Sequence, residues 1–321
     1  MAAAGAVVAR VESRKSKVGS RKSEVESRKS KVESRVVNRA GEQRRALVLA
    51  GAALAVFVVV MVLLELVAPR LAFFAPYPVL GSLLVATVFL GAAGSALALA
   101  IRLPLPAWVA GAVLVVAAAA DVAIVLLAGD SIPSPWAEIA LNLVLLVGAV
   151  AAGGLLARVI GDLSRAVPVC LVIIVVDLWS VFAPSGVTRK IVESFESGES
   201  MLLGFLLASF PVPGLENARS GLGVTDLVFV AAFLGLLGRA RLPVRGSLLA
   251  ILAALLVTIV LGGLLALPVP ALPLIAVAFW AVNFRSMRMA TGEKLQTALF
   301  VAALILVLGG YSLIAHGLSG G

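Results

Sequence analysis

Residues 173–190 read IIVVDLWSVFAPSGVTRK, and the carboxylate of Asp177 interrupts a run that is otherwise apolar enough to lie in lipid. A charged carboxylate at the centre of a membrane helix costs about 2.5 to 3.5 kcal/mol even on a lenient insertion scale. An acidic residue in such a place is therefore a candidate functional residue.

The composition of the whole chain predicts an integral membrane protein. Of 321 residues, 61% are hydrophobic and only 13% are charged, and the mean hydropathy is +1.12. Soluble domains have roughly 45 to 50% apolar and 25% charged residues. The single cysteine, Cys170, excludes an internal disulfide framework.

The first 45 residues differ from the rest and hold half of the 26 Lys and Arg residues. They contain a seven-residue repeat, RKSKVGS RKSEVES RKSKVES, over residues 14–34. One valine per repeat cannot form the two-position seam of a coiled coil, and the composition is typical of a disordered chain. A polybasic segment on anionic lipid headgroups, or translation of a repeat upstream of the true start, remain alternatives. The net charge of +9 thus describes a basic tail and does not indicate nucleic-acid binding.

Apolar runs after this tail predict an all-α polytopic bundle of about nine transmembrane helices, most of them near the roughly 20 residues needed to span a bilayer. The run MLLGFLLASFPVPGL, residues 201–215, has only about 11 apolar residues before its prolines, which predicts a re-entrant or interfacial segment. The predicted helices cover residues 46–67, 78–100, 107–128, 137–157, 166–183, 222–238, 246–266, 270–284 and 295–315.

Basic residues predict the orientation, because Lys and Arg accumulate in cytoplasmic loops. With nine spans and a cytoplasmic N-terminus, only Arg70, Arg189, Lys190 and Arg219 fall on the outer side. We therefore expect a multi-pass protein of the cell membrane with its N-terminus in the cytoplasm.

Two acidic residues, Asp177 and Asp226, are predicted to share one depth. Each lies a few residues from the outer end of its helix, roughly 6 to 9 Å below the outer surface at 1.5 Å per residue. If the helices are neighbours, charge repulsion leaves one proton shared between the two carboxylates. Such a pair can hydrolyse a peptide bond, since the ionised acid takes a proton from the attacking water and the protonated acid stabilises the oxyanion. On depth alone, two buried acids bonded to hydroxyls or arginines remain the alternative.

Three segments resemble the motifs of presenilins, in family order, over residues 170–284. VDLWSVFAPSGVTRKIVES (176–194) resembles the segment that begins with Tyr-Asp, and SGLGVTDLVFVAAFLG (220–235) resembles the Gly-Leu-Gly-Asp helix start. PVPALPLIAVAFW (268–280) contains the Pro-Ala-Leu signature as Pro270, Ala271 and Leu272. In the first segment the matching residues are Asp177, Leu178, Val181, Pro184, Gly186, Arg189, Val192 and Glu193.

Presenilins and signal peptide peptidases are polytopic intramembrane aspartyl proteases. The resemblance implies a presenilin-like bundle in which Asp177 and Asp226 are catalytic, no cofactor or metal is needed, and transmembrane helices of other proteins are the substrates. Substrate-positioning roles would fall to Gly221, Gly223 and the Pro-Ala-Leu residues. The implied division is a disordered tail (1–45), N-terminal transmembrane helices (46–165), a catalytic core (166–284) and an additional C-terminal transmembrane helix (285–321).

The chain departs from the family at three places. Val176 stands where presenilins have the tyrosine, and Val224 and Thr225 separate Gly223 from Asp226. Two extra helical residues would turn the side chain by about 200°, so we expect residues 221–225 to be non-helical, as glycines permit. Four predicted spans precede Asp177 where presenilins have five, and one more follows the Pro-Ala-Leu helix, which would place the active face outside.

Prolines at positions 268, 270 and 273 predict irregular backbone there, because each lacks an N–H and cannot continue a regular helix. An extended edge would offer unpaired backbone groups to an unwound substrate. A simple tight turn between two helices is the alternative.

Two further functions remain open: a catalytically inactive presenilin-like scaffold, and a secondary transporter that carries protons past Asp121, Asp177 and Asp226. Asp121 is predicted to form a hydrogen bond with Asn142 between adjacent helices, unless it belongs to the proton pathway of a transporter. No His, Cys or Glu cluster suggests a metal site, and no glycine loop with lysine suggests a nucleotide.

Two polar residues near span ends are expected to lie at the membrane interface. Glu65 is predicted to extend its carboxylate toward the headgroups, and His316 to be interfacial and not a ligand.

Overall fold

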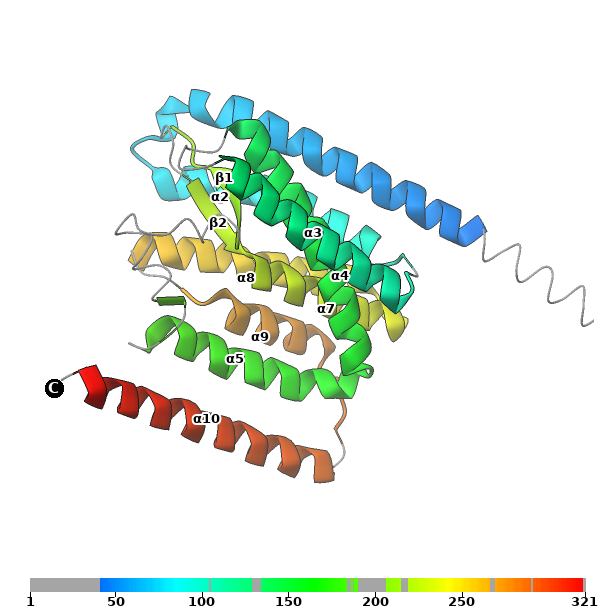
Figure 1. Cartoon of the computed structure of the whole chain (residues 1–321), viewed down its shortest axis with the longest axis vertical. Coiled ribbons are helices and arrows are strands. Elements are labelled where there is room, and N and C mark those ends of the chain that lie inside the picture. The colour runs from blue at the N-terminus through cyan, green and yellow to red at the C-terminus, as the bar shows by residue number, and fades with distance from the viewer. Residues whose placement is uncertain are drawn as a thin grey trace, which may run out of the picture. The chain divides into compact units, whose positions relative to one another are not determined.

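The computed structural model describes residues 41–103, 105–128, 134–183, 186, 188–189, 206–214, 219–265, 269–289 and 291–319. Contacts divide the chain into two units, residues 1–48 and residues 49–321. The described part of the first unit, residues 41–48, is helical. Apart from the first helix, which begins in the first unit, the elements and contacts described below belong to the second unit (Figure 1).

Each predicted helix range contains a helix in the described part of the chain, although residues 222 and 223 of the range 222–238 belong to a strand. Seven helices are long and apolar enough to cross a membrane, so the architecture is that of an all-α polytopic membrane protein. Two others, of 16 and 13 residues, are shorter, and the count of nine spans stays a prediction. The helices are Gly41–Arg70, which ends in the 3-10 turn Ala68–Arg70, α2 (Pro78–Ala100), α3 (Ala107–Ala128), α4 (Pro135–Ile160), α5 (Ala166–Phe182), α7 (Val224–Arg239), α8 (Val244–Leu265), α9 (Ala271–Asn283) and α10 (Thr291–Ser319).

The start of α4 shows why these helices begin where they do. The Ser134 side chain accepts the N–H of Ala137 at 3.3 Å, and Pro135 occupies the first helical position. Serine is a favoured N-cap because its oxygen binds a backbone N–H that has no partner within the helix. Proline fits the next position because its missing N–H is not needed there.

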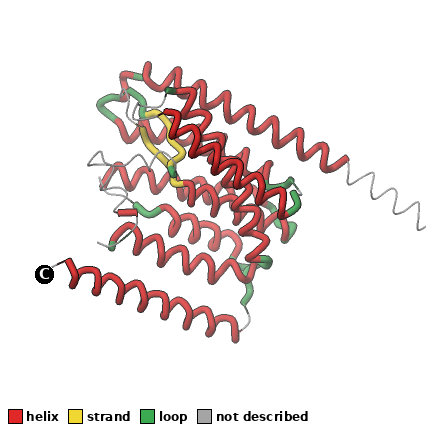
Figure 2. The backbone as a smooth tube through the Cα atoms, in the orientation of Figure 1, coloured by secondary structure: helices red, strands yellow, loops and turns green. Residues whose placement is uncertain are grey.

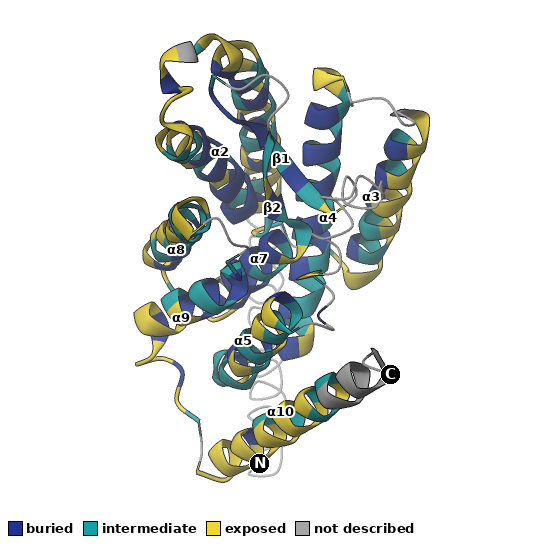
Figure 3. Cartoon of the chain, turned by 90° about the vertical axis from the view of Figure 1, so that its left-hand side faces the viewer, coloured by how far each residue is buried: buried dark blue, intermediate teal, exposed yellow. Residues whose placement is uncertain are grey.

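Helix α7 forms the buried centre of this unit. It contacts α2, α4, α8 and α9, and most of its residues from Asp226 to Leu237 are buried, as the dark blue ribbon in Figure 3 shows. By contrast, α3 and α10 expose large apolar side chains such as Leu127 and Leu306. Apolar faces of that extent suit lipid and not water.

Small residues bring α4 and α7 into close contact. A Cβ added at Gly153 of α4 would lie 2.5 Å from the Cβ of Ala231 on α7, and one added at Gly235 would lie 3.0 Å from the Cβ of Ala157. Each helix thus presents two small residues four positions apart, a pattern that lets membrane helices approach closely. This contact fixes the position of α7, which carries Asp226.

The structure also contains two strands that the sequence did not predict. β1 (Leu207–Pro211) and β2 (Arg219–Gly223) pair antiparallel, with Leu207 opposite Gly223 and Pro211 opposite Arg219, and they appear yellow among the helices in Figure 2. β1 lies in the run 201–215, for which we expected a re-entrant or interfacial segment; the described residues of that run form a strand and a turn. Its alternating burial, with Ala208 and Phe210 buried, is typical of a strand.

Candidate functional site

The structure brings Asp177 and Asp226 together. Asp177 lies near the end of α5, and Asp226 is the third residue of α7. The two carboxylates lie close enough for their charges to interact. Asp226 is only 8% exposed, while Asp177 is partly exposed, so one acid faces the interior and the other is accessible.

Helix α9 holds this pair in place, because it contacts both α5 and α7. Phe279 of α9 stacks on Phe233 of α7 with ring centroids 4.2 Å apart and planes 10° from parallel. Stacked buried rings of this kind contribute about 0.5 to 1.5 kcal/mol beyond their area burial. The three helices therefore form the framework of the acidic pair.

Asp226 is fixed by the backbone just before it. Its carboxylate turns back toward the backbone of Gly223, the extended N-cap residue of α7. An acidic side chain at the third helical position is placed as in half of a capping box. A Cβ added at Gly223 would lie 3.1 Å from Oδ2 of Asp226, so glycine keeps this approach open.

The expectation of non-helical backbone over residues 221–225 was only partly right. The stretch from Gly221 to Gly223 belongs to strand β2, but Val224 and Thr225 are the first two residues of α7. The extended backbone therefore ends at Gly223, and α7 begins two residues before Asp226.

Asp177 caps a different helix. Its Oδ2 accepts the backbone N–H of Leu272 at 3.1 Å, and Leu272 is the second residue of α9. The first N–H groups of a helix have no partner within it, and a negative charge is favoured at that end. The Pro-Ala-Leu signature thus contacts the candidate site directly, through the backbone of its leucine.

The expected irregular backbone over residues 268–273 is shorter than we predicted. Helix α9 begins at Ala271 and includes Pro273, whose missing N–H is tolerated in a first turn. Val269 and Pro270 are non-helical, and Pro270 has extended dihedral angles of −65° and 124°. Position 268 lies outside the described residues.

The hairpin before Asp226 is anchored to α4 by Asn142. The amide Nδ2 donates to the carbonyl of Ser209 at 2.7 Å, and the Ser209 N–H donates to Oδ1 at 2.9 Å. The predicted bond between Asn142 and Asp121 was wrong, because this backbone pair occupies the amide. Oδ1 of Asp121 is buried without a hydrogen-bond partner among the described residues.

A cluster of three charges anchors the other strand. Arg219 of β2 pairs with Glu65 at 2.5 Å and also with Glu138, and both glutamate side chains are only 8% exposed. The prediction that Glu65 extends toward the headgroups was therefore wrong. Glu138 and Asn142 are four residues apart on one face of α4. That spacing could have indicated that both bind the same structural element, here the β1–β2 hairpin.

The segment after α5 folds back over the end of that helix. The hydroxyls of Ser180 and Thr188 lie 2.7 Å apart, and the Thr188 N–H donates to the Ser180 hydroxyl at 3.0 Å. A Cβ at Gly186 would overlap the backbone at Ser180. Since Ser180 lies one helical turn beyond Asp177, these contacts fix the backbone beside the candidate site.

A cavity of about 490 Å³ opens beside strand β2, between α2 and α8. Its wall includes Arg219, Ser220 and Gly221 of the strand, and Val269 just before α9. The two segments that lead into Asp226 and into Leu272 therefore border one space.

Among the described residues, no group of three or more His, Cys, Asp or Glu side chains is placed to hold a metal ion. The side chain of His316 lies outside the described ones. Comparison with known protein families, curated proteins and solved structures finds no match to this chain.

Proposed function

We propose that this protein is an intramembrane aspartic endopeptidase, in which Asp177 and Asp226 activate a water molecule for attack on a peptide bond of a transmembrane helix. The observation that carries the proposal is that two carboxylates from separate helices lie near enough for their charges to interact, one buried and one partly exposed, inside an apolar bundle.

The proposed chemistry requires one proton between the two acids. The ionised carboxylate removes a proton from water as the oxygen attacks the carbonyl carbon, and the protonated carboxyl donates to the developing oxyanion. The proton belongs to the pair, so we assign the two roles to the pair and not to a particular acid.

The β2 strand and its neighbouring cavity support a substrate of extended backbone. A transmembrane helix satisfies its own backbone groups, so its peptide bonds become accessible only after local unwinding. An unwound segment needs new partners, which an adjacent strand can supply. β2 ends at Gly223, so a segment placed along it would reach the two acids.

The position of Asp121 argues against the transporter alternative. Asp121 lies on α3, which packs chiefly on α4. A relay from Asp121 to the acidic pair would have to pass through the α4–α7 contact, where small apolar residues are close-packed.

The test is cleavage of a reporter transmembrane peptide by the purified protein in liposomes. Asp177→Asn and Asp226→Asn should each remove essentially all turnover, and the double variant should be little worse, because the pair acts as a unit. Asparagine has the size of aspartate and keeps a carbonyl oxygen, which at position 177 can still accept the N–H of Leu272, so these variants should stay folded. Wild-type turnover should also depend on pH as a bell-shaped curve.

Two controls separate the alternatives. Asp121→Asn should leave cleavage intact, whereas a proton-coupled transporter would lose flux through this change. Pro270→Ala should lower turnover modestly by altering substrate placement. Cleavage by Asp177→Asn at the parent rate would eliminate the proposed pair, and a parent protein that cleaves no tested helix would favour the inactive scaffold.

A further inference from the structure

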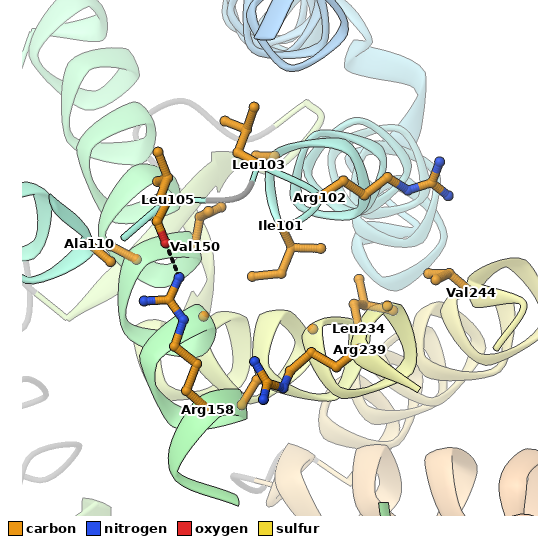
Figure 4. A pocket seen from close by; sticks show the side chains of 16 residues that line it. Ile101, Arg102, Leu103, Leu105, Ala110, Val150, Arg158, Leu234, Arg239 and Val244 are labelled. Atoms are coloured by element: carbon orange, nitrogen blue, oxygen red, sulfur yellow. Dashed lines mark hydrogen bonds between the residues drawn. The ribbon is translucent and has the colours of Figure 1, made fainter. Parts of the chain in front are cut away.

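A second cavity lies far from the acidic pair, at the C-terminal ends of α2, α4 and α7. It has a volume of about 330 Å³ and is lined mainly by apolar side chains together with three arginines, Arg102, Arg158 and Arg239 (Figure 4). No acidic residue lines it, and the structure shows no ion pair from any of the three arginines to another described residue.

Arg158 is the most constrained of the three. Its Nη2 donates to the carbonyl of Leu105, the bond drawn in Figure 4, while its Nη1 is buried and has no hydrogen-bond partner among the described residues. A buried guanidinium nitrogen without an acceptor is costly, because the desolvation of a charged donor is not compensated. The structure therefore holds an unpaired donor at this cavity.

The other two arginines and the N-terminus of α8 also lie at this cavity. Arg239 is the last residue of α7 and is exposed. Arg102 lies at the rim with its guanidinium turned outward in Figure 4, and as an exposed side chain it can rotate. Val244, the first residue of α8, also lines the cavity, and the N-terminus of a helix favours an anion.

We propose that this cavity binds a phosphate group, that of an anionic phospholipid headgroup. Arginine forks match phosphate oxygens with paired, charge-assisted hydrogen bonds. Basic pockets between membrane helices on the cytoplasmic side bind lipid headgroups in this way, and all three arginines fall on the predicted cytoplasmic side. Apolar lining residues such as Leu103 and Leu234 suit the glycerol and acyl portion of a lipid better than a free ion.

This site is distinct from the acidic pair and does not depend on the proposed proteolysis. Asp226 and Arg239 lie at opposite ends of α7, about 20 Å apart at 1.5 Å per residue. A lipid at the cavity would therefore contact the same helix that carries one of the two acids, without touching the site itself.

The test is lipid binding by the purified full-length protein, followed by native mass spectrometry in a neutral detergent. Phosphatidylglycerol is compared with phosphatidylcholine, and inorganic phosphate is added as a competitor in a separate arm. Near-surface arginines contribute about 1 kcal/mol each toward anionic lipid, so Arg239→Gln should weaken phosphatidylglycerol binding about fivefold. The double variant Arg158→Gln with Arg239→Gln should weaken it by clearly more than this loss of about fivefold, because it also removes the buried donor that has no partner in the described part of the chain.

Arg285→Gln is the matched control, because Arg285 is exposed, is predicted to lie on the same side of the membrane and does not line the cavity. Phosphatidylglycerol binding by this variant should be unchanged. The basic tail is present in every variant and contributes equally. Arg239→Gln alters only an exposed side chain, so it keeps the test valid if the double variant fails to fold.

Equal binding of the two lipids, or equal losses in Arg239→Gln and Arg285→Gln, would overturn the proposal. Displacement of phosphatidylglycerol by millimolar phosphate would keep the phosphate site but assign it to the free ion. Retention of the lipid under that competition would support the headgroup.

Discussion

The close contact between α4 and α7 leaves no room for a side chain at Gly153. A Cβ at this position would lie 2.5 Å from the Cβ of Ala231, 2.7 Å from the carbonyl oxygen of Val228 and 2.8 Å from the N of Ala232. Two of these three neighbours are backbone atoms, which a side-chain rotation cannot move. Gly153→Ala must therefore push the helices apart by about 1 Å to restore ordinary contact distances.

The expected cost follows from that displacement. Overpacking by a single methyl group typically costs about 1 to 3 kcal/mol, which for a chain of this size lowers the melting temperature by roughly 2 to 4 °C per kcal/mol. A shift of about 1 Å in α7 also moves Asp226, and misplacement on that scale reduces catalysis by about 100-fold. The proposed proteolysis should therefore fall more steeply than stability does.

Thermal unfolding in detergent and cleavage of the reporter peptide measure the two effects. Gly148→Ala is the control on the same helix, since its Cβ would meet only the Cβ of Ala117 at 3.5 Å. Adding Ala231→Gly to Gly153→Ala removes one of the three contacts and should restore only part of the loss. If Gly153→Ala unfolds at the same temperature as Gly148→Ala, the reasoning on close packing is wrong.

Three further outcomes are expected. Arg219→Gln leaves two buried carboxylates without their counter-charge and should destabilise the protein by about 3 kcal/mol, measured by thermal unfolding. Asn142→Ala orphans the N–H and carbonyl of Ser209, which should cost about 1 to 3 kcal/mol and speed amide hydrogen exchange in β1; unchanged exchange there would contradict the anchoring role. Cysteines at Ser197 and Leu267 should react with an impermeant thiol reagent on whole cells, and labelling only after lysis would reverse the predicted orientation.

The helices were predictable because each depends on a local property of the chain. Long apolar runs bounded by proline, glycine or arginine fix the helical ranges, so the starts of α2 at Pro78 and of α3 at Ala107 match the prediction. The sequence placed Asp177 and Asp226 near each other through their predicted depths; the charges of the two acids do interact, while the depths themselves stay a prediction.

The strands and their anchors were not predictable from local pattern. β1 is a five-residue segment next to prolines, and β2 contains two glycines, a residue type that disfavours strands. Their stability comes from contacts distant in sequence, namely Asn142 with Ser209 and Arg219 with two glutamates. The partner of Asn142 was misassigned for the same reason, because helix spacing alone cannot reveal a hairpin that lies alongside.

The hydrogen bond from Leu272 to Asp177 links the proposed chemistry to the seating of a helix. A carboxylate has two oxygens and about four acceptor sites, so Asp177 can hold α9 through Oδ2 and still receive water at its other sites. In the proposed mechanism, the bond from Leu272 orients this carboxylate, and a movement of α9 on substrate entry would turn Asp177 with it. The position of one helix and the geometry of the proposed chemistry would therefore change together.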